Sequence, residues 1–187
     1  MTSPLLVVSD TSPVSALVVM GWLDWLRQRW SEVHVPDMVW AELHRRSTPA
    51  DWSKLEDARC EGWLKVTSVK DASAVATLIA EDLDPGESEA IVLAQELDAD
   101  LLLVDESDGR RRAAARGLKY TGTVGIVLWA KLEGLIPSAR QALRKLREEA
   151  NFFLAKDLIE YVAQEAGEPN LVDEIDALVK LGRTNEE

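Results

Sequence analysis

Two short apolar runs in this sequence each lead to a carboxylate. Leu5–Val8 is followed by Ser9 and Asp10, and Leu101–Val104 is followed directly by Asp105. A short, continuously apolar run is typical of a strand buried on both faces of a parallel sheet. The carboxyl ends of such strands meet at one edge, where open α/β sheets build their sites. We therefore expect both aspartates to face one crevice.

Asp10 also has a purely structural interpretation. Asp, Thr and Ser favour helix N-termini and Pro is tolerated in the first turn, so the stretch Asp10–Pro13 predicts the start of a helix. Asp10 could then serve only as a cap. The same design at Asp105 favours a shared site over capping alone.

Two glutamates interrupt apolar helices. Glu42 lies in a helix predicted from Asp37 to about Arg46, and Glu89 lies in a helix that opens at Glu87. Glu87 occupies the first turn, where the helix macrodipole favours an anion, so a structural role explains it well. Glu89 lies deeper, beside apolar residues. A solvated side chain is the default for Glu42. We take Glu42 and Glu89 as candidates, with Glu87 as the alternative to Glu89.

The candidate site residues are all carboxylates, namely Asp10, Glu42, Glu89 and Asp105, with Asp108 as a competitor of Asp105. Neighbouring carboxylates repel one another and raise one another's pKa unless cations intervene. Sites made of oxygen ligands select Mg²⁺ or Mn²⁺ and not zinc. His34 and His44 fit no zinc-binding pattern, so we interpret both as structural.

A basic run follows Asp105 on a predicted helix, and its members are Arg110, Arg111, Arg112 and Arg116. Arginines beside a group of acids could hold the phosphates of a nucleic-acid substrate. A solvated helix face explains any one of them at least as well.

The composition is that of an ordinary globular protein. The 187 residues are 47% hydrophobic and 29% charged. The net charge of −12 argues against a passive nucleic-acid-binding module, but carboxylates around bound cations would account for part of it. The sequence contains no uninterrupted run of about eighteen apolar residues, so no membrane span is expected. The lone Cys60 forms no internal disulfide, which suits a cytoplasmic protein.

The order of the elements predicts the fold class. Strands and helices alternate from residue 5 to residue 134, which is typical of a mostly parallel central sheet in a three-layer α/β/α sandwich. Beyond it we predict a helical C-terminal extension of three amphipathic helices at 138–150, 155–166 and 171–181. We expect one domain over 1–187, with a core at about 5–135 and C-terminal helices at about 138–182.

Four motifs in this order resemble those of a PIN domain: Val8–Ser12, Gly86–Ile91, Leu102–Glu106 and Gly122–Gly125. More narrowly, they resemble a prokaryotic PIN-like branch related to VapC-type toxins. The resemblance covers about residues 5 to 165. It implies a PIN-like α/β/α sandwich and a Mg²⁺- or Mn²⁺-dependent ribonuclease.

The resemblance also assigns roles to residues. The family's four acids would be Asp10, Glu42, Glu89 and Asp105. Asp10 and Asp105 would be direct metal ligands, Glu42 and Glu89 would bind the metal or orient its waters, and Ser12 would support Asp10. The Glu at the third position departs from the commoner Asp, and Asp108 competes near the fourth. Glu87 and Asp108 therefore stay open as ligands.

The expected substrate is RNA, and the chain could be the toxin of a toxin–antitoxin pair with a small antitoxin protein as its partner. The alternative is a catalytically silent PIN-like module that acts through protein contacts. A receiver domain ranks low because Lys119 is not convincingly placed for one. A homodimer is expected because the helices near both ends contain more apolar residues than packing within one small helical layer requires. These residues include Trp22, Trp25, Leu26, Leu171, Val172 and Ile175.

Overall fold

The computed structural model describes residues 5–168. The chain divides into two compact units between Thr123 and Val124. The first unit contains the five strands found in the described residues, and the second is helical.

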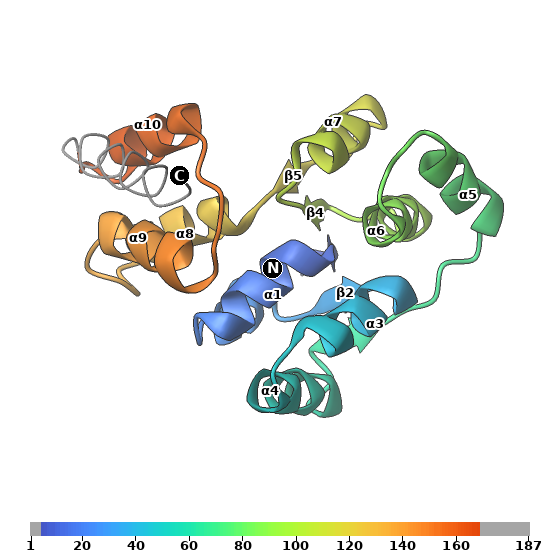
Figure 1. The fold of residues 1–187 in the computed structure, drawn as a ribbon, viewed down its shortest axis with the longest axis horizontal. Coiled ribbons are helices and arrows are strands. Elements are labelled where there is room, and N and C mark those ends of the chain that lie inside the picture. Colours follow the sequence, from blue (N-terminus) through green and yellow to red (C-terminus); the bar gives the residue numbers. More distant parts are fainter. Residues whose placement is uncertain (1–4, 169–187) are drawn as a thin grey trace, which may run out of the picture. The chain divides into compact units, whose positions relative to one another are not determined.

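The first unit is built on a parallel sheet (Figure 1). Its strands lie in the order β3-β2-β1-β4-β5, and all four neighbouring pairs are parallel. In chain order the strands are β1 Val7–Ser9, β2 Val33–Val35, β3 Leu64–Val66, β4 Leu101–Leu103 and β5 Tyr120–Thr121. The strand order reverses at β1, which therefore occupies the centre of the sheet.

Both faces of the sheet are covered. Successive residues of a strand point to opposite faces, yet Val7 and Val8 are both fully buried, as are Leu102 and Leu103 of β4. Burial on both sides is the normal state of a parallel sheet flanked by helices. The predicted α/β/α sandwich is confirmed.

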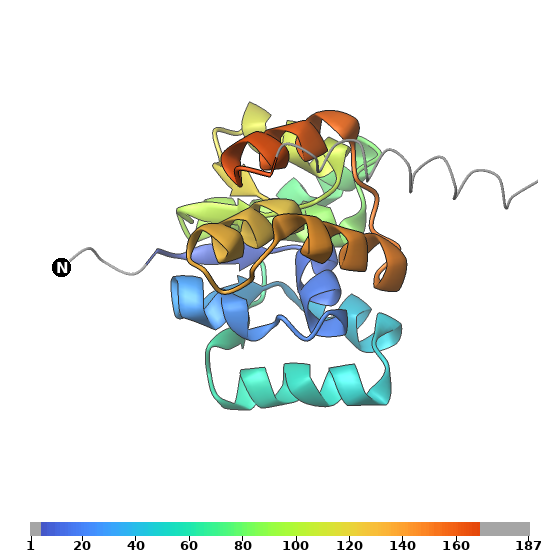
Figure 2. The same cartoon turned by 90° about the vertical axis from the view of Figure 1, so that its left-hand side faces the viewer.

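Seven helices of the first unit connect the strands (Figures 1 and 2). The helix α6 packs on β1 and β4, α2 on β2, α4 on β3, and α7 on β5. Their bounds are α1 Thr11–Val19, α2 Asp24–Trp30, α3 Asp37–Arg46, α4 Pro49–Cys60, α5 Ala72–Ala80, α6 Pro85–Glu96 and α7 Ser107–Ala115.

In α4 and α6, a side-chain cap and a proline together mark where the helix begins. The Thr48 hydroxyl accepts a hydrogen bond from the Asp51 amide at the start of α4, and the Asp84 carboxylate accepts one from the Gly86 amide at the start of α6. Each cap is followed by a proline in the first turn, where its missing amide proton costs nothing. The cap at Asp84 places Glu87 in the first turn of α6.

The second unit contains α8 Thr123–Leu132, which begins at the last residue of the first unit, α9 Ala139–Glu149 and α10 Lys156–Glu165. Glu168 holds the start of α9, because its carboxylate accepts hydrogen bonds from the Ala139 and Arg140 amides and the Ser138 hydroxyl. Burial raises the pKa of Glu168, but these hydrogen bonds outweigh it and the pKa is lowered. The predicted helix at 171–181 lies outside the described residues.

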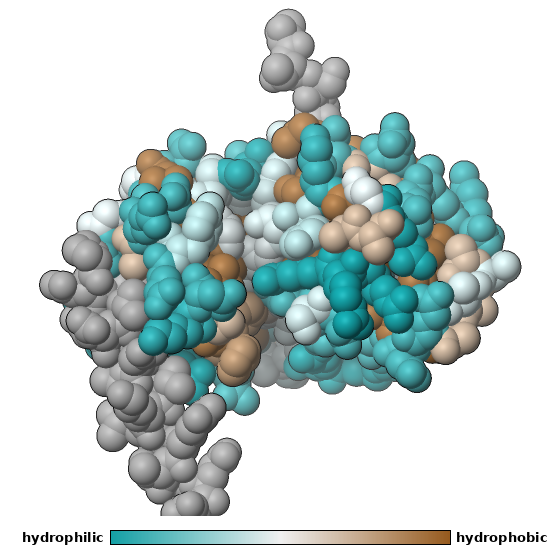
Figure 3. Space-filling model, turned by 90° about the horizontal axis from the view of Figure 1, so that it is seen from above, coloured by the Kyte–Doolittle hydropathy of each residue, from teal (hydrophilic) through white to brown (hydrophobic). Residues whose placement is uncertain are grey.

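Part of the apolar surplus behind the homodimer prediction is used inside the chain. Leu26 is fully buried, and Trp25 is buried with its ring stacked on Trp22 at a centroid distance of 4.6 Å. On the face drawn in Figure 3, hydrophilic residues predominate and hydrophobic ones form small, separate patches. Among residues 5–168, no helix is both long and apolar enough to cross a membrane. The homodimer stays a prediction.

Candidate metal centre

A pocket with a volume of about 190 Å³ lies at the carboxyl-terminal edge of the central strands. It is located where the strand order reverses, which is the usual position of a site in an open α/β sheet. Most of its lining side chains are acidic, and two are basic. The lining residues are Asp10, Thr11, Ser12, Glu42, Arg45, Arg46, Asp84, Glu87 and Glu106.

Asp10 lies at the junction of β1 and α1. It is the N-cap residue of α1, but its side chain makes no capping hydrogen bond, and only 3% of the residue is exposed. Burial raises its pKa to about 7, with smaller contributions from Glu42 and Asp105, while the amides of Thr11 and Ser12 lower it. Capping alone therefore does not explain Asp10, and its carboxylate is available to the pocket.

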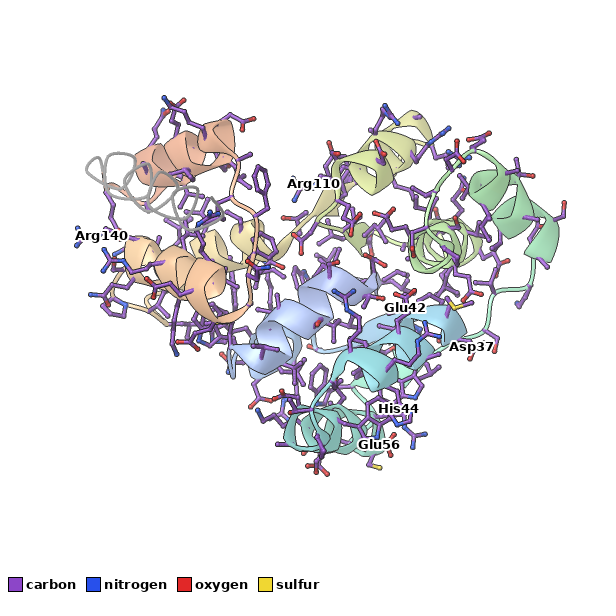
Figure 4. All side chains as sticks on the ribbon, viewed as in Figure 1. Asp37, Glu42, His44, Glu56, Arg110 and Arg140 are labelled. Carbon is purple, nitrogen blue, oxygen red and sulfur yellow. The ribbon has the colours of Figure 1, made fainter. Side chains whose placement is uncertain are left out.

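Glu42 extends into the pocket from α3 (Figure 4). The Thr11 hydroxyl donates a hydrogen bond of 2.6 Å to Glu42 Oε2. Gly86 also approaches this carboxylate, since a Cβ there would lie 3.0 Å from Glu42 Oε2. The Thr11 hydroxyl thus supports Glu42, a role that the sequence did not indicate. Thr11 and Ser12 both line the pocket, and the support of Asp10 by Ser12 stays a prediction.

Glu87 is the acid of α6 that faces the pocket. It is 4% exposed, and its Oε1 is buried without a hydrogen-bond partner. Burial raises the pKa of Glu87 to about 8, and the charges of Asp10, Glu106 and Asp84 raise it further. A buried carboxylate oxygen without a partner is costly unless a cation or a proton neutralises it.

Glu89 points elsewhere. Its Oε2 accepts a hydrogen bond of 2.9 Å from the Met38 amide in the first turn of α3, and it does not line the pocket. Each residue turns a helix by about 100°, so Glu87 and Glu89 leave α6 on nearly opposite sides. The structure therefore places Glu87 at the pocket and gives Glu89 a structural bond, the reverse of what the sequence favours.

The acids after β4 separate in the same way. Asp105 accepts hydrogen bonds from the Thr123 amide at 2.8 Å and the Thr123 hydroxyl at 2.6 Å, and it is not a lining residue. Burial raises the pKa of Asp105. Its neighbour Glu106 lines the pocket instead, whereas Asp108 is exposed and pairs with Arg111 at 2.9 Å.

Gly122 leaves room for this arrangement. A Cβ at this position would collide with the Asp105 carboxylate and the Arg110 guanidinium and lie 3.0 Å from the Val104 carbonyl oxygen. We expect Gly122→Ala to lower the free energy of unfolding by about 1–3 kcal/mol, the usual cost of overpacking. Urea unfolding measures this loss. An Ala variant as stable as the wild type would contradict the described position of Asp105.

The arginines predicted beside the site make their contacts outside the pocket. Arg110 donates to the Val104 carbonyl oxygen at 3.1 Å and lies 3.5 Å from Asp105. Arg112 pairs with Glu81, and Arg116 donates to the Arg112 carbonyl oxygen. These residues and Arg111 do not line the pocket.

The lining arginines are Arg45 and Arg46 of α3. The sequence contains a signal for them, because Arg45 and Arg46 follow Glu42 at spacings of three and four residues. Residues at these spacings lie on one face of a helix, so if Glu42 faces the pocket, Arg45 and Arg46 are expected to lie beside it. Arg45 Nη2 lies 3.9 Å from Glu42 Oε1, and the Arg45 side chain is 66% exposed.

The donor set fits Mg²⁺ or Mn²⁺. Within the part of the chain that the structure describes, no three acidic, His or Cys side chains already stand close enough to enclose an ion. Carboxylates that repel one another are expected to stand apart without a cation. The fit rests on the donors, which are all oxygens, and on the unpartnered Glu87 Oε1.

Comparison with known families identifies the fold. The chain matches the family DUF3368, described as a PIN domain, over residues 6–168. The match includes every residue that lines the pocket. No curated protein matches the chain. PIN domains are generally nucleases that use divalent metal ions, and the finer relationship to VapC-type toxins stays a prediction. The chain belongs to the PIN-domain family, as its motifs predict.

Proposed function

We propose that this protein is a metal-dependent endoribonuclease that hydrolyses RNA phosphodiesters. The observation that carries the proposal is the convergence of Asp10, Glu42, Glu87 and Glu106 with two arginines on one pocket. Buried carboxylates with raised pKa values are characteristic of functional sites, because a stable fold has no need of them.

The four acids Asp10, Glu42, Glu87 and Glu106 would hold Mg²⁺ or Mn²⁺. When bound, such an ion supplies a water of lowered pKa as nucleophile and positive charge for the leaving oxygen. The Thr11 hydroxyl fixes the orientation of the Glu42 carboxylate. Asp105, held by Thr123, adds negative charge beside Asp10 and keeps its place as a proposed site residue.

Arg45 and Arg46 supply the positive side of the pocket. Their guanidinium groups can bind phosphate oxygens in a forked geometry, which would position the RNA backbone against the acids. The acidic lining alone would repel that backbone. The two arginines therefore give the pocket its affinity for a polyanion.

We expect Arg45→Ala and Arg46→Ala each to weaken RNA binding and to reduce the salt dependence of log Kd by about one unit. Arg111→Ala is the matched control, since Arg111 is exposed and pairs with Asp108 outside the pocket. Binding of a labelled RNA in EDTA at several salt concentrations measures both quantities. Equal slopes for all three variants would remove Arg45 and Arg46 from the site.

Cleavage of a mixed RNA substrate tests the proposal itself. We expect cutting with Mg²⁺ or Mn²⁺, none with EDTA, and products with a 5′-phosphate and a 3′-hydroxyl. Products ending in a 2′,3′-cyclic phosphate would contradict attack by water. A folded protein that binds the ions but cuts no RNA would favour the silent interaction module.

A role as the toxin of a toxin–antitoxin pair is part of the same proposal. An antitoxin that blocks the pocket would contribute a basic residue, because the pocket is rich in carboxylates. Expression of the wild type in a bacterial host would then arrest growth, and Asp10→Asn would relieve the arrest. Arrest that is equal for both would point to a cause other than cleavage.

A further inference from the structure

Three aromatic rings and a guanidinium form a cluster on α3 and α4. The Trp52 ring centroid lies 4.6 Å from that of Trp40 and 4.4 Å from that of His44. The guanidinium of Arg59 lies over Trp40 at 5.7 Å from the ring centroid. His44 is exposed, and both tryptophans are partly exposed. The cluster therefore presents aromatic surface to solvent.

This cluster and the pocket share one helix. Trp40 and His44 are four residues apart and lie on the same side of α3, while Glu42, midway between them, faces the pocket. Figure 4 labels Glu42 and His44, which leave α3 on different sides. A helix is only about 10 Å across with its side chains. A polymer whose phosphate lies in the pocket could thus reach the rings by crossing the last turn of α3.

The charge on that turn suits a polyanion. The last turn of α3 carries two arginines, Arg45 and Arg46, although the whole chain has a net charge of −12. Arg45 and Arg46 line the pocket, and His44 belongs to the cluster. A strand that crosses the turn therefore meets positive charge first and aromatic faces next, which is how proteins bind single-stranded nucleic acid.

We propose that Trp40, His44 and Trp52 form a base-stacking platform for single-stranded RNA whose backbone enters the pocket. The proposal rests on the proposed function for the identity of the polymer, and it adds a binding surface for bases outside the pocket. A second tryptophan pair, Trp22 and Trp25, also stacks at 4.6 Å, but Trp25 is buried. That pair provides the control.

The test compares two RNA probes that carry the same charge. One is a labelled eight-nucleotide RNA, and the other is the same backbone with abasic sites in place of most bases. Binding is followed by fluorescence anisotropy in EDTA, so that no cleavage occurs. We expect the full wild-type chain to bind the intact RNA about tenfold more tightly than the abasic one. His44→Ala and Trp52→Leu should each reduce this preference several-fold, whereas His44→Phe and Trp22→Leu should keep it.

The outcomes separate the platform from the nuclease. If His44→Ala and Trp52→Leu keep the wild-type preference, or the wild type binds both probes equally, the platform is wrong even where metal-dependent cleavage is present. If the preference for intact RNA falls in His44→Ala and Trp52→Leu but no condition yields cleavage, the stacking platform is supported and the nuclease proposal is wrong. His44 is exposed, so its Ala and Phe variants decide the matter should Trp52→Leu not fold. A third outcome is a wild-type dimer that shows no preference between the two probes and that dissociates in the Trp52→Leu variant. It would mean that the rings contact a second copy of the chain, and it would overturn the proposal.

Discussion

Replacing Asp10 with Asn is expected to reduce RNA cleavage by about 10³-fold while the chain stays folded. Asp10 is buried, lines the pocket and makes no capping hydrogen bond to α1, and an Asn side-chain oxygen can still face the Thr11 and Ser12 amides, so we expect the fold to survive the change. The positive charge it would hold is worth several kcal/mol in the transition state, and each 1.36 kcal/mol is a factor of ten in rate. Initial rates with saturating Mn²⁺ measure the effect.

Asp57→Asn is the control for this variant, because Asp57 is exposed on α4 and does not line the pocket. It should cut RNA at the wild-type rate. Thermal unfolding of both variants shows whether lost activity reflects lost structure. Cleavage by Asp10→Asn within tenfold of the wild-type rate would remove Asp10 from the catalytic centre.

Replacing Glu87 with Gln is expected to stabilise the metal-free protein at pH 8 by about 1–2 kcal/mol, or about 3–6 °C in Tm. The wild-type carboxylate is buried, its Oε1 has no partner, and several acids surround it. A neutral amide of the same shape removes the charge and can donate to those acids. Thermal unfolding in EDTA measures the gain.

The stability of the wild type should fall as the pH rises in EDTA. The pKa values of Asp10 and Glu87 are raised to about 7 and about 8 in the folded chain, from ordinary values of 3.8 and 4.5. Between the unfolded and the folded pKa values, the folded chain binds more protons than the unfolded chain, so the free energy of unfolding falls as the pH rises. The stability that Asp10 and Glu87 contribute is therefore largest below the unfolded pKa values and is lost as the pH rises through 7–8. Glu87→Gln should flatten this decline. An equally steep decline in the variant would show that Glu87 does not titrate in this range.

Metal ions should reverse the decline. Mg²⁺ or Mn²⁺ binds only the folded site, so a concentration ten times its Kd raises the free energy of unfolding by about 1.4 kcal/mol. We expect the Tm of the wild type to rise more on adding metal at pH 8 than at pH 5.5, where protons compete for the carboxylates. Glu87→Gln should lose most of this shift. Glu89→Gln should keep it, because its remaining oxygen can still accept the Met38 amide proton.

The two central strands with an aspartate after each were readable from the chain alone. Apolar runs and capping residues are local signals, and the carboxyl ends of parallel strands must meet at one edge. Asp10 and Asp105 are thereby predicted on the same side of the sheet, and the position of Glu42 within an apolar helix makes it a further candidate. The parallel sheet of the structure confirms the predicted sandwich, and the family match confirms the predicted PIN domain.

Which acids and arginines share the pocket was decided by the tertiary structure. Glu87 and Glu89 differ by two positions, and only the packing of α6 against α3 turns the first toward Asp10 and the second toward Met38. Helix propensity and the macrodipole act within one helix, so they favoured a structural role for Glu87. The pocket's positive charge likewise comes from α3 and not from the basic run of α7. The periodicity of a helix can be read from its own residues, but the direction in which its side chains point depends on how it packs against elements far away in the chain.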